Sequence, residues 1–181
     1  IASHVVRELL ERGYRVRTTV RDLAATDKSD HLRQLSEDIG QPLEIVEADL
    51  LVADSFDEAF KDCDYVCHVA AVAKLSAANP EQSIVAPSVE GTRNVLKSVV
   101  KAGTITRYVH TSSVAAVSPT GHHSDQIFNE DSWNDNATLK NNPYGLAKTK
   151  AEKLLWSFIE QLPEDKRFEA VSINPVLVAG P

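Results

Sequence analysis

The sequence predicts an α/β protein with a doubly wound parallel sheet. Segments with helical periodicity alternate along the 181 residues with short segments rich in β-branched and aromatic residues, which is the pattern of strand, helix and strand units. One of these segments, residues 64–71, is apolar almost throughout, as expected of a strand that a parallel sheet buries on both faces. Ligands of such sheets bind beyond the carboxyl ends of the strands, so we expect the functional residues there.

The first half of the chain supplies two strands. Apolar residues repeat at helical spacing from Ile1 to Leu10, and Gly13 stands where that helix would end. Ser55-Phe56-Asp57-Glu58 has the capping-box pattern that opens a helix. The elements expected from this half, in chain order, are a helix that ends at Gly13, a strand over 14–20, a helix over 29–39, a strand over 43–48 and a short helix opened by the capping box.

The second half of the chain supplies three strands and two long helices. Asparagine followed by proline marks the start of each helix, at Asn79-Pro80 and at Asn142-Pro143. The expected elements, in chain order, are a strand over 64–71, a helix from Pro80 to Gly103, a strand over 107–112, an irregular polar stretch over 118–142, a helix from Pro143 whose last inward residue is Ile159, and a strand over 168–173.

No strand is expected before the first helix. In the strand order 3-2-1-4-5-6 of doubly wound dinucleotide-binding sheets, the first strand lies near the centre. We therefore expect a hole within the sheet rather than a trimmed edge. The chain opens with Ile1 and contains no methionine, which indicates a sequence whose beginning is missing.

Composition narrows the classes of function. Nineteen Lys and Arg residues against 26 Asp and Glu residues give a net charge of −7, which disfavours broad binding to a nucleic acid backbone. No apolar run approaches the roughly 18 residues of a membrane helix, so no membrane span is predicted. Cys63 and Cys67 fit neither a disulfide scaffold nor a zinc motif, and His122 and His123 lack a third ligand at metal spacing. We expect a cytoplasmic protein without a metal site.

The most informative chemical motif is Tyr144 followed four residues later by Lys148, in the first turns of a predicted helix. This spacing places both side chains on one helix face, where the ammonium group can lower the pKa of the phenol from about 10. Tyr144 is then a candidate general acid. Such a pair is common by chance, but here it follows a strand that ends in Thr111-Ser112-Ser113, whose hydroxyl groups are expected at the carboxyl edge of the sheet.

These residues and several others resemble the extended short-chain dehydrogenase/reductases. The resemblance covers essentially the whole chain and is closest to the branch that holds dihydroflavonol reductases, cinnamoyl-CoA reductases and microbial aldehyde and ketone reductases. Besides the Ser, Tyr and Lys spacing, the matching motifs are Leu10 to Val16, Thr19 to Asp22, Ala48 to Leu50, His68 to Ala71 and Asn174 to Pro181. The resemblance implies a Rossmann-type NAD(P)-binding domain that is incomplete at both ends.

The resemblance implies three catalytic residues. Tyr144 would donate a proton to the carbonyl oxygen of the substrate, and Lys148 would hold the nicotinamide ribose and tune the tyrosine. Ser113 would hydrogen-bond the same carbonyl oxygen, with Ser112 as the weaker candidate. The hydride itself would come from the cofactor, which the protein orients.

The resemblance also implies a cofactor site. Arg21 matches a position whose guanidinium meets the 2′-phosphate, so NADP (NADPH) is favoured over NAD, and Lys28 is a candidate for the same phosphate. The other residues expected to bind the cofactor, beside Tyr144 and Lys148, are Asp49 and Leu50 at the adenine, Val69, Ala70 and Ala71 at the ribose, and Pro175, Val176, Leu177 and Val178 at the nicotinamide.

Two parts of the family pattern are missing from the sequence. The glycine-rich phosphate loop is absent apart from its tail, where Ala2 matches the last small residue. The family also has a substrate-binding lobe after the segment that ends at Pro181. We therefore expect residues 1–181 to be one partial domain of a longer parent protein.

Three functions remain open. The leading prediction is an NADPH-dependent oxidoreductase that reduces the aldehyde or ketone carbonyl of a small-molecule substrate to an alcohol. The second is an NAD-dependent sugar-nucleotide epimerase or dehydratase on the same scaffold, which Arg21 disfavours. The third is a non-catalytic NADP-binding sensor, which the intact Ser113, Tyr144 and Lys148 disfavour. The oligomeric state stays open between monomer and homodimer.

Overall fold

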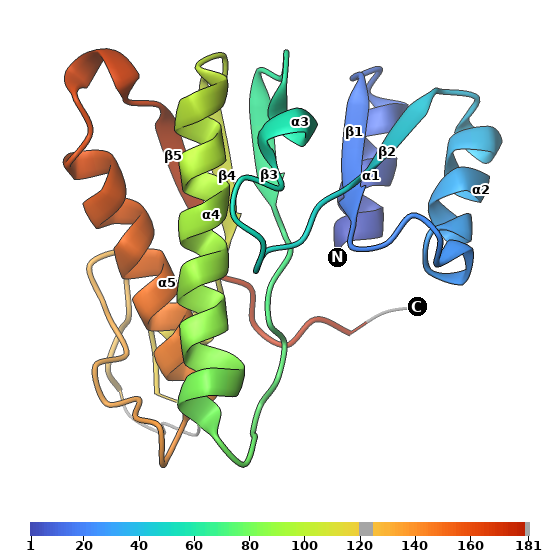
Figure 1. The fold of residues 1–181 in the computed structure, drawn as a ribbon. Coiled ribbons are helices and arrows are strands. Elements are labelled where there is room, and N and C mark those ends of the chain that lie inside the picture. The colour runs from blue at the N-terminus through green and yellow to red at the C-terminus, as the bar shows by residue number, and fades with distance from the viewer. Residues whose placement is uncertain (120–124, 180–181) are drawn as a thin grey trace.

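A computed structural model describes residues 1–119 and 125–179, and in these ranges five strands form two parallel sheets (Figure 1). The strands are β1 (Val16–Val20), β2 (Leu43–Glu47), β3 (Tyr65–His68), β4 (Arg107–Thr111) and β5 (Glu169–Ile173). β1 pairs with β2, with Val16 opposite Leu43, and β4 lies between β3 and β5 in the second sheet. Every pairing is parallel, as the sequence predicts.

Helices connect the strands. They are α1 (Ala2–Glu11), α2 (Asp30–Ile39), α3 (Asp57–Phe60), α4 (Ala86–Ala102) and α5 (Pro143–Glu160), with 3₁₀ turns over Thr26–Lys28, Val114–Ala116 and Glu164–Lys166. Figure 1 shows α4 in front of the strands and α1 behind them. Helices therefore lie on both sides of the strands, which is the doubly wound arrangement predicted from the sequence.

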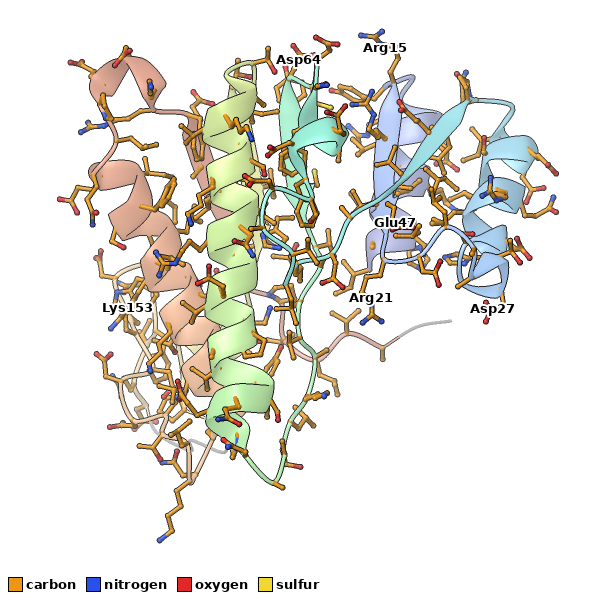
Figure 2. The ribbon with its side chains drawn as sticks, in the orientation of Figure 1. Arg15, Arg21, Asp27, Glu47, Asp64 and Lys153 are labelled. Atoms are coloured by element: carbon orange, nitrogen blue, oxygen red, sulfur yellow. The ribbon has the colours of Figure 1, made fainter. Side chains whose placement is uncertain are left out.

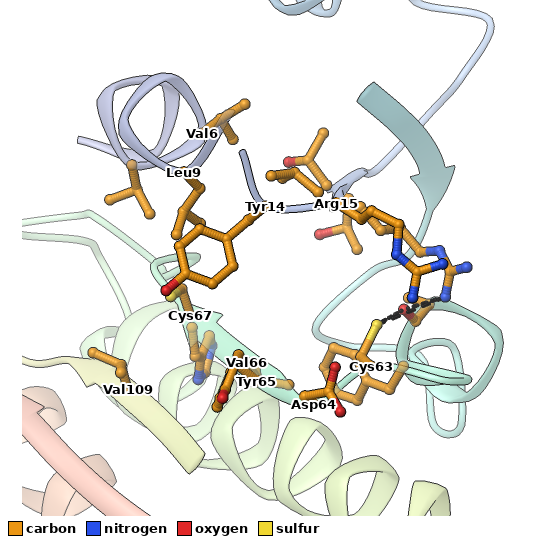
Figure 3. A pocket seen from close by; sticks show the side chains of 18 of the residues that line it. Val6, Leu9, Tyr14, Arg15, Cys63, Asp64, Tyr65, Val66, Cys67 and Val109 are labelled. Carbon is orange, nitrogen blue, oxygen red and sulfur yellow. Dashed lines mark hydrogen bonds between the residues drawn. The ribbon is translucent and has the colours of Figure 1, made fainter. Parts of the chain in front are cut away.

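β1 and β3 are neighbours with no described strand between them (Figure 1). A pocket of about 1250 Å³ occupies this gap, and its lining includes Arg15 to Thr19 on one side and Asp64 to Ala70 on the other. Figure 3 shows Leu9 of α1 and Tyr65 of β3 on opposite sides of the pocket. The hole predicted within the sheet is therefore confirmed.

Each sheet has its own apolar core. In the first, Val6 and Leu10 of α1 and Leu32 and Leu35 of α2 are buried against β1 and β2. The second core is larger and fills the space between β3–β4–β5 and the helices α3, α4 and α5. Its buried residues include Phe56, Ala59, Phe60, Val66, Val95, Leu96, Val99, Tyr108, Leu155 and Phe168. Burial of this apolar area is the main stabilising contribution in both halves.

Arg17 of β1 links the two halves. Its Nη1 donates hydrogen bonds to the carbonyl oxygens of Ala59 at 3.0 Å and Lys61 at 2.8 Å, where α3 ends. The same guanidinium pairs with Glu44 of β2 at 2.7 Å. The carbonyl groups at a helix C-terminus carry partial negative charge, so a cation is favoured there.

The predicted helix starts and stops are largely confirmed. α4 ends at Gly103, which has a φ of 69° that favours glycine. Asn142 caps α5, because its Oδ1 accepts a hydrogen bond from the Gly145 amide at 2.8 Å. The helix expected from Pro80 begins as a π-helical turn over Glu81–Val85 before α4. Pro87 has no N–H for the regular helical hydrogen bond, which accounts for the irregular start.

The capping box predicted at Ser55 does not form. α3 begins at Asp57 without a side-chain cap. Instead, the Ser55 hydroxyl donates to the carbonyl oxygen of Asp49 at 2.7 Å and accepts from the Asp49 amide at 3.2 Å. The hydroxyl group therefore holds the loop after β2, and this tertiary contact has replaced the local one.

The prediction that the strand over 64–71 is buried on both faces is wrong. β3 is shorter, and its side chains alternate: Val66 and His68 are buried, whereas Tyr65 and Cys67 are exposed. The helices α4 and α5 cover one face of this sheet, and within the described residues the other face is left open at β3. An apolar run is compatible with a strand that is buried on both faces, but it does not require such burial.

Candidate active site

Apart from Tyr144 and Lys148 on α5, the segments predicted to bind a cofactor come after strands. Arg21 follows β1, Asp49 and Leu50 follow β2, and residues 69–71 follow β3. Residues 175–178 come after β5. Because the strands are parallel, these segments share one edge, the lower edge in Figures 1 and 2, where Figure 2 labels Arg21.

Tyr144 and Lys148 lie one turn apart at the start of α5. The Lys148 Nζ is 6.0 Å from the centre of the Tyr144 ring. It donates a hydrogen bond to the carbonyl oxygen of Thr111, the last residue of β4, at 3.1 Å. Lys148 is only 8% exposed, and this burial lowers its pKa, while the charge of Glu152 acts in the opposite direction.

Ser113 lies two residues after the end of β4. Its backbone is extended, and its Oγ accepts a hydrogen bond from the Ala115 amide at 3.2 Å, which caps the turn over Val114–Ala116. The amide contact fixes the oxygen and leaves the hydroxyl proton free to be donated. The neighbouring Ser112 is buried, and its Oγ has no hydrogen-bond partner within the described part of the chain. A hydrogen bond thus fixes the side chain of Ser113, whereas the side chain of Ser112 has none within the described residues.

α4 holds the loop that contains Asp49 and Leu50. Asn94 is buried and donates from Nδ2 to the carbonyl oxygen of Leu50 at 2.9 Å. A Cβ at Gly91 would come within 3.0 Å of the Leu50 Cβ, so glycine permits the close approach of helix and loop. Neither Gly91 nor Asn94 is among the residues predicted from the sequence. The available signal was a glycine and an asparagine on one face of a long helix.

A buried polar cluster lies behind Lys148. The Nδ1 of His68 is 2.5 Å from the Tyr108 hydroxyl, and the His110 Nδ1 is 3.5 Å from it. Burial, together with the charge of Lys148, lowers the pKa of His68 to about 3 and that of His110 to about 4. Both imidazoles are therefore neutral at pH 7. The Nε2 atom of each ring is buried and has no hydrogen-bond partner among the described residues.

Several residues predicted to bind the cofactor are exposed at the carboxyl edge of the strands. Arg21 is exposed and has no ion-pair partner in the described ranges. Leu177 is 92% exposed, and Val176 and Val178 are exposed beside it. Lys28 belongs to a 3₁₀ turn, but its side chain lies outside the described part of the structure. Gly180 and Pro181 of the last matching motif are also outside the described residues.

The large pocket is the gap between the sheets rather than the predicted catalytic centre. It reaches the carboxyl edge at His68, Val69 and Ala70, and its lining does not include Ser113, Tyr144 or Lys148.

Over residues 1–119 and 125–179, no group of three or more His, Cys, Asp or Glu residues could hold a metal ion. His122 and His123 lie outside these ranges. No described helix is long and apolar enough to cross a membrane.

The chain is similar in sequence to a known protein family and to several reductases. The sequence matches the NAD dependent epimerase/dehydratase family over residues 1–181. It is 38% identical over 186 residues to an anthocyanidin reductase of Arabidopsis thaliana, with 99% of this chain and 53% of that protein aligned. It is 37% identical over 186 residues to the dihydroflavonol 4-reductase of the same plant, with 100% of this chain and 47% of that protein aligned.

A solved structure supports the fold. The yeast methylglyoxal/isovaleraldehyde reductase Gre2, crystallised with NADPH, superposes with a TM-score of 0.83 at 32% identity, over 99% of this chain and 56% of that one. The fold is therefore of the Rossmann type. The chain spans about half the length of the curated relatives that it matches.

Proposed function

Because the chain belongs to the NAD dependent epimerase/dehydratase family, whose extended short-chain reductases it resembles, we propose that it is the cofactor-binding part of an NADPH-dependent carbonyl reductase. The whole protein would reduce an aldehyde or ketone to an alcohol. One observation carries this proposal. The buried ammonium of Lys148 lies one turn after Tyr144 and is hydrogen-bonded to the end of the strand that leads to Ser113.

The residues at the carboxyl edge fit NADP(H). Thr111 takes one of the three N–H donors of the Lys148 ammonium, which leaves donors for the hydroxyl groups of a ribose. The exposed guanidinium of Arg21 suits the 2′-phosphate, because it presents several N–H donors and a permanent charge. The loop of Asp49 and Leu50, held by Asn94, would border the adenine. Residues 69–71 and 175–178 would line the ribose and nicotinamide.

When bound, NADPH supplies the hydride to the carbonyl carbon. Tyr144 passes its phenolic proton to the carbonyl oxygen, acting as the general acid. Ser113 donates its hydroxyl proton in a hydrogen bond to the same oxygen, where negative charge develops. Lys148 stabilises the phenolate that remains on Tyr144 after the proton has left.

The names of the relatives favour a reductase over an epimerase or a sensor. An anthocyanidin reductase, a dihydroflavonol 4-reductase and an aldehyde reductase with NADPH bound are all similar to this chain over nearly its full length. A binding module would need neither Tyr144 nor Ser113. The particular carbonyl compound is set by parts of the whole protein that would surround this edge.

The gap between β1 and β3 supports a partial domain. We infer that a further strand of the whole protein fills the gap and that a glycine-rich loop after that strand would meet the pyrophosphate. A separate lobe would enclose the substrate. A cytoplasmic location and a monomeric or homodimeric state remain predictions.

The test is to incubate the full-length protein with NADPH and a panel of aldehydes and ketones, and to follow NADPH oxidation at 340 nm. We expect turnover of at least one carbonyl compound, with NADPH preferred over NADH. Binding of NADPH without turnover of any compound would argue for the sensor. Conversion of a sugar nucleotide with retained NAD would argue for the epimerase.

A further inference from the structure

Glu152 is the only Asp or Glu side chain that is buried within the described residues, at 6% exposure. It lies on α5, one turn after Lys148 and two turns after Tyr144. Burial of a carboxylate costs several kcal/mol unless the charge is paired or hydrogen-bonded. Such a residue persists when its contacts compensate for that cost, so the contacts of Glu152 are informative.

Glu152 reaches Ser113 through one amide group. Its Oε2 accepts a hydrogen bond from the Asn174 Nδ2 at 2.9 Å. The same Nδ2 donates to the carbonyl oxygen of Ser113 at 3.2 Å. Asn174 is the first residue after β5, so this amide joins the loops that follow two strands to the helix that carries Tyr144 and Lys148.

Backbone hydrogen bonds hold the same two loops together. The Ser112 amide donates to the carbonyl oxygen of Ile173 at 2.8 Å, and the Val114 amide donates to that of Pro175 at 2.9 Å. These bonds stand on either side of Asn174 and fix the loops to each other. The bond between Asn174 and Glu152 adds a side-chain link from the paired loops to α5.

We propose that Glu152 and Asn174 are positioning residues, which hold Ser113 at the distance from Tyr144 that lets both donate to one carbonyl oxygen. The inference rests on the proposed function. A displacement of about 1 Å in such an arrangement can cost about 100-fold in rate, so the link has a measurable role although neither residue touches the substrate.

The first test compares two substitutions of Glu152 in the full-length protein with NADPH and its best carbonyl substrate. Glu152→Gln keeps an oxygen that accepts from Asn174, so kcat should stay within about threefold of wild type. Glu152→Ala removes the acceptor, and kcat should fall by about 10- to 100-fold with little change in the dissociation constant of NADPH. Glu160→Ala, on an exposed position of the same helix, is the control.

The second test separates positioning from stability. Asn174→Asp places a second carboxylate beside Glu152 and cannot donate to Ser113, so kcat and the melting temperature should both fall. In the double variant Glu152→Gln/Asn174→Asp, the glutamine amide donates to the new carboxylate. The link between positions 152 and 174 is then restored, but the hydrogen bond to the Ser113 carbonyl oxygen is not. We expect the melting temperature to recover and kcat to stay low.

Two results would overturn the proposal. One is an equal fall of kcat in Glu152→Gln and Glu152→Ala, which would mean that the charge matters and the hydrogen bond does not. The other is a double variant whose kcat recovers together with its melting temperature, which would mean a structural role only. Both require an active wild-type protein. A wild type that reduces no carbonyl compound refutes the proposed function instead, so the two failures can be distinguished.

Discussion

The two sheets divide the proposed reaction between them. The three-stranded sheet and α5 carry Ser113, Tyr144 and Lys148, beside the larger apolar core. Hydrogen bonds hold Ser113 and Lys148 in place. The two-stranded sheet carries Arg21 and Leu50, which would grip the phosphate and adenine ends of the cofactor, on a smaller core across the gap. The difference predicts that chemistry and cofactor selection can be damaged separately.

The largest expected effect lies in the three-stranded half. Tyr144→Phe removes the proposed general acid and leaves the ring, so kcat should fall by about 10²- to 10⁴-fold. The dissociation constant of NADPH, measured by fluorescence titration of the full-length protein, should hardly change. Tyr65→Phe is the control, because it removes a phenol from an exposed position of the same sheet. A variant that is as active as wild type would remove Tyr144 from the mechanism.

The same half should make the protein sensitive to acid. His68 and His110 have folded-state pKa values of about 3 and about 4, below the ordinary value of 6.5. The unfolded chain therefore binds protons that the folded chain does not, and stability falls as the pH drops from about 6.5 toward 4. The free energy of unfolding, measured with urea, should fall by about 2 to 4 kcal/mol between about pH 7.5 and 5.

Removal of one titrating group tests this acid sensitivity. His110→Asn stays neutral at all these pH values, so it should reduce the loss between about pH 7.5 and 5 by roughly half. A loss of unchanged size in the variant would assign the acid sensitivity to other groups.

A smaller effect is expected in the two-stranded half. Arg21→Asp should lower the preference for NADPH over NADH by about 10- to 100-fold, since charge-assisted hydrogen bonds are worth about 1.5 to 3 kcal/mol. The limiting rate with saturating cofactor should change little. Arg15→Asp is a matched control, because Figure 2 shows Arg15 at the opposite end of β1. An unchanged ratio of the two kcat/KM values would refute the phosphate role of Arg21.

The smallest effect concerns the link between the halves. Arg17→Gln loses the pair with Glu44 and weakens the bonds to the carbonyl oxygens at the end of α3, so the free energy of unfolding should fall by about 1 to 2 kcal/mol. Chemical denaturation measures the change, and Arg33→Gln, an exposed arginine of α2, is the control. The kcat of the full-length protein should stay close to that of wild type. A clear fall in kcat would show that the two halves do not act separately.

The elements that rest on local chemistry could be predicted from the sequence. The cap at Asn142 and the glycine after α4 need only a few neighbouring residues, and both are found where the sequence places them. The alternation of strands and helices predicts a parallel sheet, and the absence of a strand before the first helix predicts the gap. These features depend on the spacing of apolar residues and on local backbone geometry, and both can be read from neighbouring residues in the sequence.

The contacts that rest on tertiary structure could not be predicted. Ser55 has the pattern of a cap, yet its hydroxyl bonds the loop of Asp49 because that loop approaches from β2. Asn94 and Glu152 meet partners 44 and 22 residues away. Nothing in the local pattern around them names these partners. The sequence shows the motif that includes Asn174, but it does not show the hydrogen bond that the Asn174 amide donates to Glu152.

The open edges of β1 and β3 bear on how the protein behaves at high concentration. Each edge offers a row of backbone N–H and C=O groups, which is a template for another chain. Tyr65, 58% exposed, adds an apolar side chain beside one edge. A polypeptide limited to residues 1–181 should therefore aggregate, because the strand edges of different molecules can pair with each other. A synthetic peptide that fills the gap should keep it monomeric, which light scattering would reveal before any assay of catalysis.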